Sequence, residues 1–160
     1  MTRLNKGQPF PKLQVPAVGG GMLNLPEDLA GQFGVVLIYR GSWCPFCSKQ
    51  LARFQEASDA LVELGVRVAA LSVDDEETSR RLIEKLELGF PVGHSADVAK
   101  VAEATGAYVD DELTYLQATE FVLAPDSTVA EASYSSGAGG RLTPFDVAGL
   151  IRYIRKYSCA

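Results

Sequence analysis

A junction between an apolar strand and a long helical pattern lies at Tyr39-Arg40-Gly41-Ser42-Trp43-Cys44-Pro45-Phe46-Cys47. The run 34–39 is almost continuously apolar, as expected of a strand buried on both faces. The helical pattern begins at Pro45, which suits the first turn of a helix because a backbone N–H at that position has no intrahelical partner. The junction therefore places Cys44 at a helix start, with Cys47 one turn further along.

This position predicts redox chemistry for the two cysteines. Unpaired backbone N–H groups at a helix N-terminus stabilise negative charge, and the thiolate is the reactive form of cysteine. We therefore expect Cys44 to be the more acidic and the more exposed thiol. Cys47 lies on the same helix face, where its sulfur can form a disulfide with Cys44 without a change in the scaffold.

Length and composition describe one globular domain, residues 1–160. The chain has 160 residues, of which 47% are hydrophobic and 22% are charged, which suffices for a full core. The formal net charge of −5 argues against nucleic-acid and anionic membrane surfaces, which need clustered lysine and arginine. No apolar run is long enough to span a bilayer, and residues 1–10 lack the apolar centre of a signal peptide. These features predict a cytoplasmic location.

The pattern predicts alternating strands and helices around a mixed sheet. Strand–helix–strand order over 34–73 indicates a parallel unit, and Pro125-Asp126 indicates a tight turn between two antiparallel strands. Thr143-Pro144-Phe145-Asp146 is typical of a helix start, with Leu150, Ile151, Ile154 and Tyr157 facing inward. The expected elements are an N-terminal hairpin (15–18 and 22–25), a short helical turn (26–31), strands 34–39, 66–73, 118–123 and 128–135, an extended piece (90–92), and helices 45–64, 76–88, 97–105 and 143–157. Gly19-Gly20-Gly21 is expected to supply positive φ for the hairpin turn, Gly65 to end the helix 45–64, and Asp97 to cap the helix that follows it. Residues 108–115 are expected to form a connecting loop or a short helical turn, and residues 135–140 a flexible connector.

The other candidate groups give weaker indications. Asp74-Asp75-Glu76-Glu77 is better explained by helix capping than by cation binding. His94, the only histidine, titrates near neutrality and is either a proton shuttle for a thiol or a solvated loop residue. Cys159 is expected to be an incidental thiol. One Cys-x-x-Cys pair supplies only half of a structural zinc site, so we predict no metal and no bound cofactor.

The residues quoted above resemble those of the peroxiredoxin-like (AhpC/TSA, redoxin) branch of the thioredoxin fold over nearly the whole chain. The match rests on the block 39–47, and on Gly7 with Pro9-Phe10, 23–31, Leu71-Ser72-Val73-Asp74 and Phe90-Pro91-Val92 through Asp97. The resemblance implies an α/β thioredoxin-like fold in which helices flank a central mixed sheet with an N-terminal β-hairpin extension. It also implies a thiol-dependent antioxidant oxidoreductase.

Two departures from the family pattern separate this chain from typical members. The motif Pro-x-x-x-Thr/Ser-x-x-Cys is absent. With Cys44 as its cysteine, the Pro and Thr/Ser positions fall on Leu37 and Gly41. With Cys47 as its cysteine, they fall on Arg40 and Cys44. The distal arginine of the family would fall near Leu116 or Gln117. Neither residue is cationic, and Arg40 is the candidate that would replace the distal arginine near Cys44. The thioredoxin proline is absent too, and Thr119 takes its place.

The resemblance and the Cys-x-x-Cys pair together predict an enzyme in which Cys44 attacks and Cys47 resolves, with Arg40 and Thr119 as further catalytic residues. Gly41, Ser42, Trp43 and Pro45 are the predicted substrate-binding residues. The substrate is a peroxide or, alternatively, a protein disulfide, and a non-catalytic redox sensor or interaction module remains a third reading. The implied partners are a thiol reductant (thioredoxin, glutaredoxin or glutathione) and a second copy in a homodimer, without nucleic acid or membrane.

Overall fold

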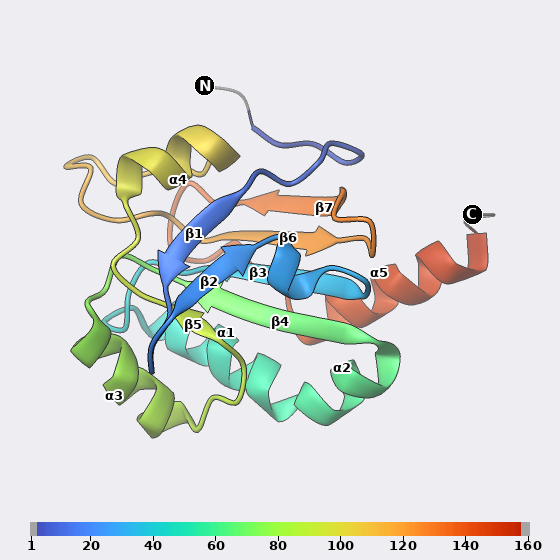
Figure 1. Cartoon of the computed structure of the whole chain (residues 1–160), viewed down its shortest axis with the longest axis horizontal. Coiled ribbons are helices and arrows are strands. Elements are labelled where there is room, and N and C mark those ends of the chain that lie inside the picture. Colours follow the sequence, from blue (N-terminus) through green and yellow to red (C-terminus); the bar gives the residue numbers. More distant parts are fainter. Residues whose placement is uncertain (1–2, 158–160) are drawn as a thin grey trace.

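The computed structural model describes residues 3–157 and shows a mixed sheet between two layers (Figure 1). The strand order in the five-stranded sheet is β5-β4-β3-β6-β7. β3 (Phe33–Ile38), β4 (Val66–Leu71) and β5 (Val92–Gly93) run parallel to one another, β6 (Thr119–Leu123) pairs antiparallel with β3, and β7 (Val129–Tyr134) pairs antiparallel with β6. Every residue of β3 is buried, as its apolar run predicts. The expected mixed sheet flanked by helices is confirmed.

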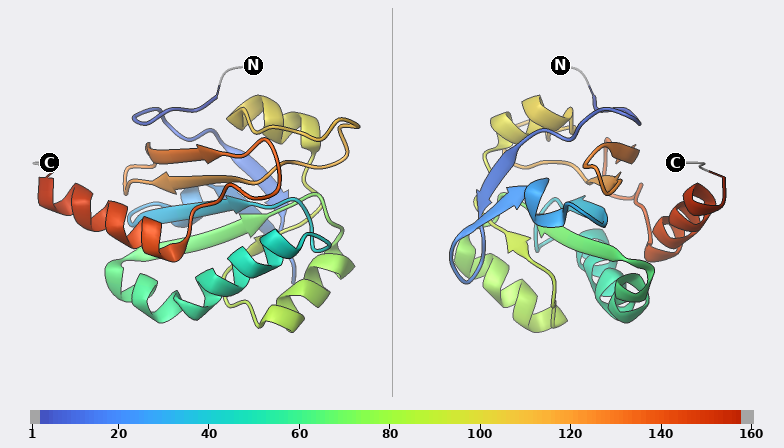
Figure 2. Two further views of the ribbon diagram at one scale, coloured as in Figure 1. Left: turned by 180° about the vertical axis from the view of Figure 1, so that it is seen from behind. Right: turned by 45° about the vertical axis from the view of Figure 1, so that its right-hand side comes forward.

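Two apolar clusters of side chains cover opposite faces of the sheet, and Figure 2 shows helices on both sides of it. One contains side chains of the N-terminal hairpin and of α4 (Val98–Thr105). The other contains side chains of α1 (Pro45–Glu56), α2 (Ser58–Leu64), α3 (Glu76–Leu86) and α5 (Pro144–Tyr157), together with Cys44 and Cys47. The redox pair therefore belongs to the helical face.

The N-terminal hairpin forms as the glycine pattern predicts. β1 (Leu13–Pro16) pairs antiparallel with β2 (Met22–Leu25), and a short 3₁₀ helix, η1 (Glu27–Leu29), follows. Gly19, Gly20 and Gly21 in the turn have φ of 95°, 114° and 73°, a region that side chains with a Cβ rarely adopt. The hairpin packs its apolar side on the sheet through Leu23 and Leu25, both fully buried.

The helix expected over 45–64 is wrong as a single element. α1 ends at Glu56, and Ala57 (φ −89°, ψ 6°) separates it from α2, which ends at Gly65 in the left-handed conformation, as predicted. No Gly or Pro marks the break. The break arises from packing, because α2 contacts β4 and α5 and its Leu61 side chain is buried. Tertiary contacts thus override a continuous local pattern.

Helix capping accounts for several of the predicted boundaries. Asp75 caps α3 by accepting a hydrogen bond from the backbone N–H of Thr78, and Asp97 caps α4 in the same way. The backbone N–H of Thr143 donates to the Asp146 carboxylate, and the backbone N–H of Asp146 donates to the Thr143 hydroxyl. This reciprocal pair begins α5 at the expected place.

The inward orientation predicted for Tyr157 is wrong. In α5 the side chain of Ile151 is fully buried and those of Leu150 and Ile154 are partly buried, whereas Tyr157 is 62% exposed. The last turns of α5 extend beyond the sheet (Figure 1), so no core lies beneath Tyr157. Its ring instead contacts that of Tyr153, with a centroid distance of 5.0 Å.

Gly93 in β5 allows the hairpin to approach the sheet closely. A Cβ at this position would overlap Val15 Cγ2 and lie 3.3 Å from Leu71 Cβ. We predict that Gly93→Ala lowers the free energy of unfolding by about 1–3 kcal/mol, the usual result of overpacking a core. Gly149→Ala is the control, because nothing lies within 4 Å of its added Cβ in α5; it should stabilise the helix by about 0.5–1 kcal/mol. Urea unfolding measures both, and equal effects would contradict this explanation.

Candidate active site

The loop after β3 brings both cysteines to the start of α1. Cys44 is the N-cap residue, with extended backbone angles, and Pro45 occupies the first turn. Cys44 and Cys47 lie 3.2 Å apart, and both are free thiols. Each side chain is fully buried, so the expectation that Cys44 is the more exposed of the two thiols is wrong. The cause lies in two arginine side chains that approach the sulfurs.

Arg40 contacts both cysteines through different groups. Its Nη1 lies 3.5 Å from Cys44 Sγ, and its backbone N–H donates to Cys47 Sγ with an N···S distance of 3.2 Å. The guanidinium also donates from Nη2 to the hydroxyl of Tyr115 at 3.1 Å. The sequence prediction that a guanidinium lies near Cys44 is therefore met by the geometry.

An aromatic pair holds the Arg40 side chain in place. The Arg40 guanidinium carbon lies 4.9 Å from the Trp43 ring centroid and 5.2 Å from that of Tyr115. The two rings meet edge to face, with centroids 5.0 Å apart. Such cation–π contacts restrict a long side chain while leaving its N–H groups free to donate. The sequence indicates a connecting loop or a short helical turn for residues 108–115, and it did not predict Tyr115 at the site.

Arg141 is a second cation that sequence reasoning missed. Its Nη2 lies 3.0 Å from Cys47 Sγ and 3.7 Å from Cys44 Sγ. Nη1 donates to Gln50 Oε1 at 2.9 Å, and Nε donates to the carbonyl of Ala138 at 2.8 Å. Arg141 follows the glycine-rich connector 135–140, far in sequence from Leu116 and Gln117, where the family pattern placed an arginine. The sequence feature that could have indicated Arg141 is its position as a cationic residue directly after the connector 135–140.

The pKa values of the two thiols are shifted in opposite directions. For Cys44, burial raises the pKa, but hydrogen bonds from Cys47 and Arg40 and the charge of Arg141 outweigh it, so the pKa lies below its usual value. For Cys47, burial raises the pKa, and the hydrogen bond that its S–H donates to Cys44 raises it further. Cys44 is therefore the more acidic thiol, as its position at the helix start predicts.

The remaining predicted loop residues shape the approach to the sulfurs. A Cβ on Gly41 would overlap the indole of Trp43, so glycine permits Trp43 to lie over this turn. The backbone N–H of Ser42 donates to Asp74 Oδ2 at 2.8 Å, which ties the loop to the end of β4. Trp43 is 56% exposed and Pro45 is also exposed. These two side chains therefore lie on the solvent side of the loop that carries Cys44.

Thr119 lies at the start of β6, opposite Ile38 at the end of β3. This register brings it to the same edge of the sheet as the loop that carries Cys44. Its side chain is fully buried, and its hydroxyl donates to the carbonyl of Gln117 at 3.0 Å rather than to either sulfur. Thr119 is thus close to the site in the sheet register, and its chemical role stays a prediction.

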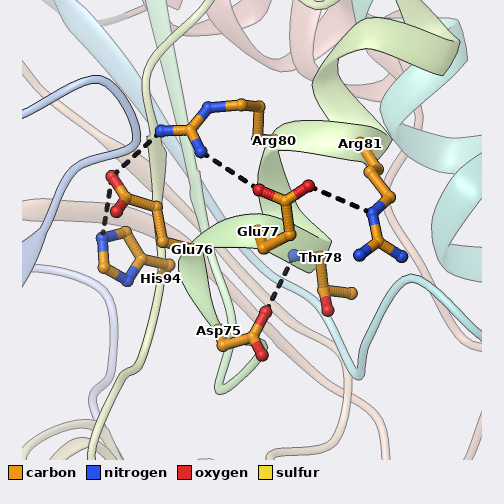
Figure 3. A network of polar contacts seen from close by, with 7 residues as sticks. All are labelled: Asp75, Glu76, Glu77, Thr78, Arg80, Arg81 and His94. Carbon is orange, nitrogen blue, oxygen red and sulfur yellow. Dashed lines mark hydrogen bonds and ion pairs between the residues drawn. The ribbon is translucent and has the colours of Figure 1, made fainter.

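His94 interacts with the N-terminus of α3 (Figure 3). Its Nε2 lies 3.8 Å from Glu76 Oε2, and its Nδ1 lies 2.8 Å from the Ser95 hydroxyl. Glu76 also pairs with Arg80 in the same network. These contacts join His94 to the surface of α3 and provide no link to the cysteines.

The structure gives two further results on metal and membrane binding. In residues 3–157, no cluster of three or more His, Cys, Asp or Glu side chains is arranged to hold a metal ion. Within the same range, no helix has both the length and the apolar character needed to cross a bilayer. Cys159 lies outside the described residues.

Comparison with known proteins gives the family. The family model described as AhpC/TSA family matches residues 6–132. A peroxiredoxin of Methanothermobacter thermautotrophicus is 28% identical over 155 residues, which cover 93% of this chain and 72% of the relative. The thiol-disulfide oxidoreductase ResA of Bacillus cereus is 28% identical over 130 residues, covering 81% of this chain and 69% of that protein.

Solved structures share the fold. Peroxidoxin BcpB of Mycobacterium tuberculosis superposes with a TM-score of 0.79 at 18% identity, covering 97% of this chain and 99% of that chain. AhpC of Mycobacterium tuberculosis superposes with a TM-score of 0.81 at 17% identity, covering 99% and 97%. The predicted class of enzyme, a thiol-dependent oxidoreductase of peroxiredoxin type, agrees with these matches. The chain belongs to the AhpC/TSA family, as the resemblance in its sequence predicted.

Proposed function

We propose that this protein reduces peroxides, with Cys44 as the nucleophile and Cys47 as the resolving cysteine. The observation that carries the proposal is the pair of guanidinium groups on the two sulfurs, Arg40 on Cys44 and Arg141 on both. Cations favour the thiolate, which is the attacking form, and they also stabilise the negative oxygen that develops as the O–O bond breaks.

The proposed reaction has two steps. The Cys44 thiolate attacks one oxygen of ROOH, the O–O bond breaks, and the products are a sulfenic acid on Cys44 and ROH after one proton is taken up. The Cys47 thiolate then attacks the sulfenic sulfur, and hydroxide leaves as water with one proton, giving the Cys44–Cys47 disulfide. The 3.2 Å separation supports a direct second step.

The two arginines offer an explanation for the missing Pro-x-x-x-Thr/Ser-x-x-Cys motif. In the proposed site their N–H groups take over the role of the absent hydroxyl as donors to the peroxide. Gly41, Ser42, Trp43 and Pro45 would bind the substrate by shaping the loop over the sulfurs, and Thr119 would support it from β6.

Turnover requires a thiol reductant, and we propose thioredoxin, glutaredoxin or glutathione in the cytoplasm. Each would reduce the Cys44–Cys47 disulfide by thiol–disulfide exchange. The formal net charge of −5 supports a protein without nucleic-acid or membrane partners. A homodimer is proposed from the family resemblance.

Stopped-flow fluorescence of Trp43, the only tryptophan, tests the proposal. Trp43 adjoins Cys44, so oxidation of the pair should change its emission. Micromolar hydrogen peroxide is expected to produce a rapid change followed by a slower one. If peroxide leaves the signal unchanged while a protein disulfide alters it, the protein is a disulfide reductase and the peroxidase proposal is wrong. Continued turnover in a coupled reductase assay is expected and would exclude a non-catalytic sensor.

A further inference from the structure

Glu120 is a buried carboxyl group on the face of the sheet that carries the redox pair. It lies in β6 opposite Leu37 of β3, whose side chain packs in the same cluster as Cys44 and Cys47. The side chain of Glu120 is fully buried, and its Oε2 has no hydrogen-bond partner among the described residues. Burial of a carboxyl group with an unpaired oxygen lowers the stability of the fold. No step of the proposed reaction uses Glu120.

Hydrogen bonds join Glu120 to the segment that carries Arg141. Its Oε1 accepts from the backbone N–H of Leu142 at 2.7 Å. Gln50 of α1 donates to the carbonyl of the same residue at 3.0 Å and accepts from Arg141 Nη1 at 2.9 Å. Arg141 in turn lies 3.0 Å from Cys47 Sγ. An unbroken set of contacts therefore runs from Glu120 to the resolving sulfur.

We propose that Glu120 is a positioning residue for disulfide formation: its carboxylate holds the 141–142 segment so that Arg141 stays on Cys47 and favours the Cys47 thiolate. This rests on the proposed function, in which Cys47 resolves the sulfenic acid. Glu120 does not touch the sulfurs in this arrangement. It acts through Arg141, whose positive charge lowers the pKa of Cys47 against the effect of burial.

The ionisation of Glu120 makes this control dependent on pH. Burial raises the pKa of Glu120 to about 7, although the Leu142 N–H and the charge of Arg141 act in the opposite direction. Above that pH the group is a carboxylate and binds the segment by a charge-assisted hydrogen bond. Below it the charge is lost, and the hold on Arg141 weakens. Disulfide formation should therefore become faster as pH rises through about 7.

Few other groups near Glu120 can produce this dependence. The segment before α5 contributes Arg141, the N-cap of α1 is Cys44, and its first turn contributes Cys47. β3 and β7 place Leu37 and Ser133 beside it, neither of which titrates. Tyr39, which follows β3 in the same cluster, stays protonated near pH 7 because burial raises its pKa to about 12. α5 contributes the apolar side chains Val147 and Ile151 to the same cluster. The cysteines can be separated from Glu120 by substitution.

The first test measures Cys47 without peroxide. In a Cys44→Ser background, the rate of Cys47 alkylation is followed against pH with and without Glu120→Gln. Glutamine keeps the shape and an acceptor for Leu142 but lacks the charge. We expect Glu120→Gln to raise the apparent pKa of Cys47. An unchanged profile would overturn the proposal, and this result is independent of whether the protein reduces peroxides.

The second test measures disulfide formation in the protein with both cysteines. Glu120→Gln should slow the step after Cys44 oxidation by roughly tenfold at pH 8, a size typical of replacing a hydrogen bond to a charged group by one to a neutral group. The inflection of the pH–rate profile near pH 7 should disappear as well. Glu131→Gln, on the exposed side of β7, is the matched control and should behave as the parent. Circular dichroism confirms the fold of each variant.

A double substitution decides whether Glu120 acts through Arg141. In an Arg141→Gln background, Glu120→Gln should cause no further slowing, because the group it positions is already absent. Full additivity of the two effects would show that Glu120 acts by another route and would overturn the proposal. Retention of an inflection near pH 7 in Glu120→Gln would do the same, because ionisation of Cys47, whose pKa is raised, gives only a steady rise of the rate there.

Discussion

Replacement of Cys44 by serine should abolish peroxide reduction, with a loss of roughly ten thousandfold or more, as is typical when the nucleophile of an enzyme is removed. A serine hydroxyl remains protonated near neutral pH and cannot use the stabilisation that Arg40 and Arg141 give to a thiolate. Because serine fills nearly the same volume, the first turn of α1 should stay intact. The measurement is the rate of hydrogen peroxide consumption with an excess of thiol reductant.

Cys47→Ser is the matched control for the roles of the two cysteines. It retains the nucleophile but lacks the resolving thiol, so one equivalent of peroxide should be consumed and a sulfenic acid should accumulate on Cys44. Trapping with a dione reagent followed by mass spectrometry would locate it. Accumulation on Cys47 in the Cys44→Ser variant would instead reverse the assignment of roles.

The second largest effect is expected for Arg40→Met, which removes a cation 3.5 Å from Cys44 Sγ. Methionine keeps much of the apolar contact with Trp43 and Tyr115. We predict that kcat/KM for peroxide falls by about 10²–10³, the range found when one donor to a developing anion is deleted. Arg67→Met, at an exposed position of β4, should leave kcat/KM unchanged.

A pH profile separates loss of charge from general damage. The guanidinium of Arg40 helps to hold the pKa of Cys44 below its usual value. The native thiol should therefore stay reactive as pH falls, until pH passes through that lowered pKa. In Arg40→Met the decline should begin at a higher pH. If alkylation of Cys44 follows the same profile in both proteins, Arg40 does not activate the thiol.

Local sequence signals were sufficient for most of the fold. Glycines at 19–21 marked a turn with positive φ, Asp75 and Asp97 marked helix starts, and Gly65 marked a helix end. In each case a single residue type satisfies a backbone requirement within a few positions of itself. The strand–helix–strand unit followed from the change between continuous and periodic apolar patterns.

Features that depend on distant contacts were not predictable in the same way. The break at Ala57 follows from the packing of α2 and leaves no local mark. The arrival of Arg141 at the cysteines depends on the path of the connector after β7, which sequence spacing does not define. Burial of Cys44 has the same origin, because residues far along the chain supply part of its cover.

Glu120 shows how a functional candidate can be hidden in a structural pattern. In the sequence it is the only charged residue of the predicted strand 118–123. The structure buries it beside the redox pair, and only the Arg141 segment explains how a carboxylate can be accommodated there. A single acidic residue inside a predicted buried strand is the sequence feature that could have indicated this role.

The placement of both cysteines at the start of α1 affects whether the protein can still be reduced after oxidative stress. A resolving thiol held 3.2 Å away acts at a very high effective concentration, whereas a second peroxide must diffuse in from solution. On the proposed mechanism, the sulfenic acid would close to the disulfide before it could be oxidised to the irreversible sulfinic acid. A burst of peroxide would then leave the protein oxidised but recoverable, awaiting only a supply of reductant.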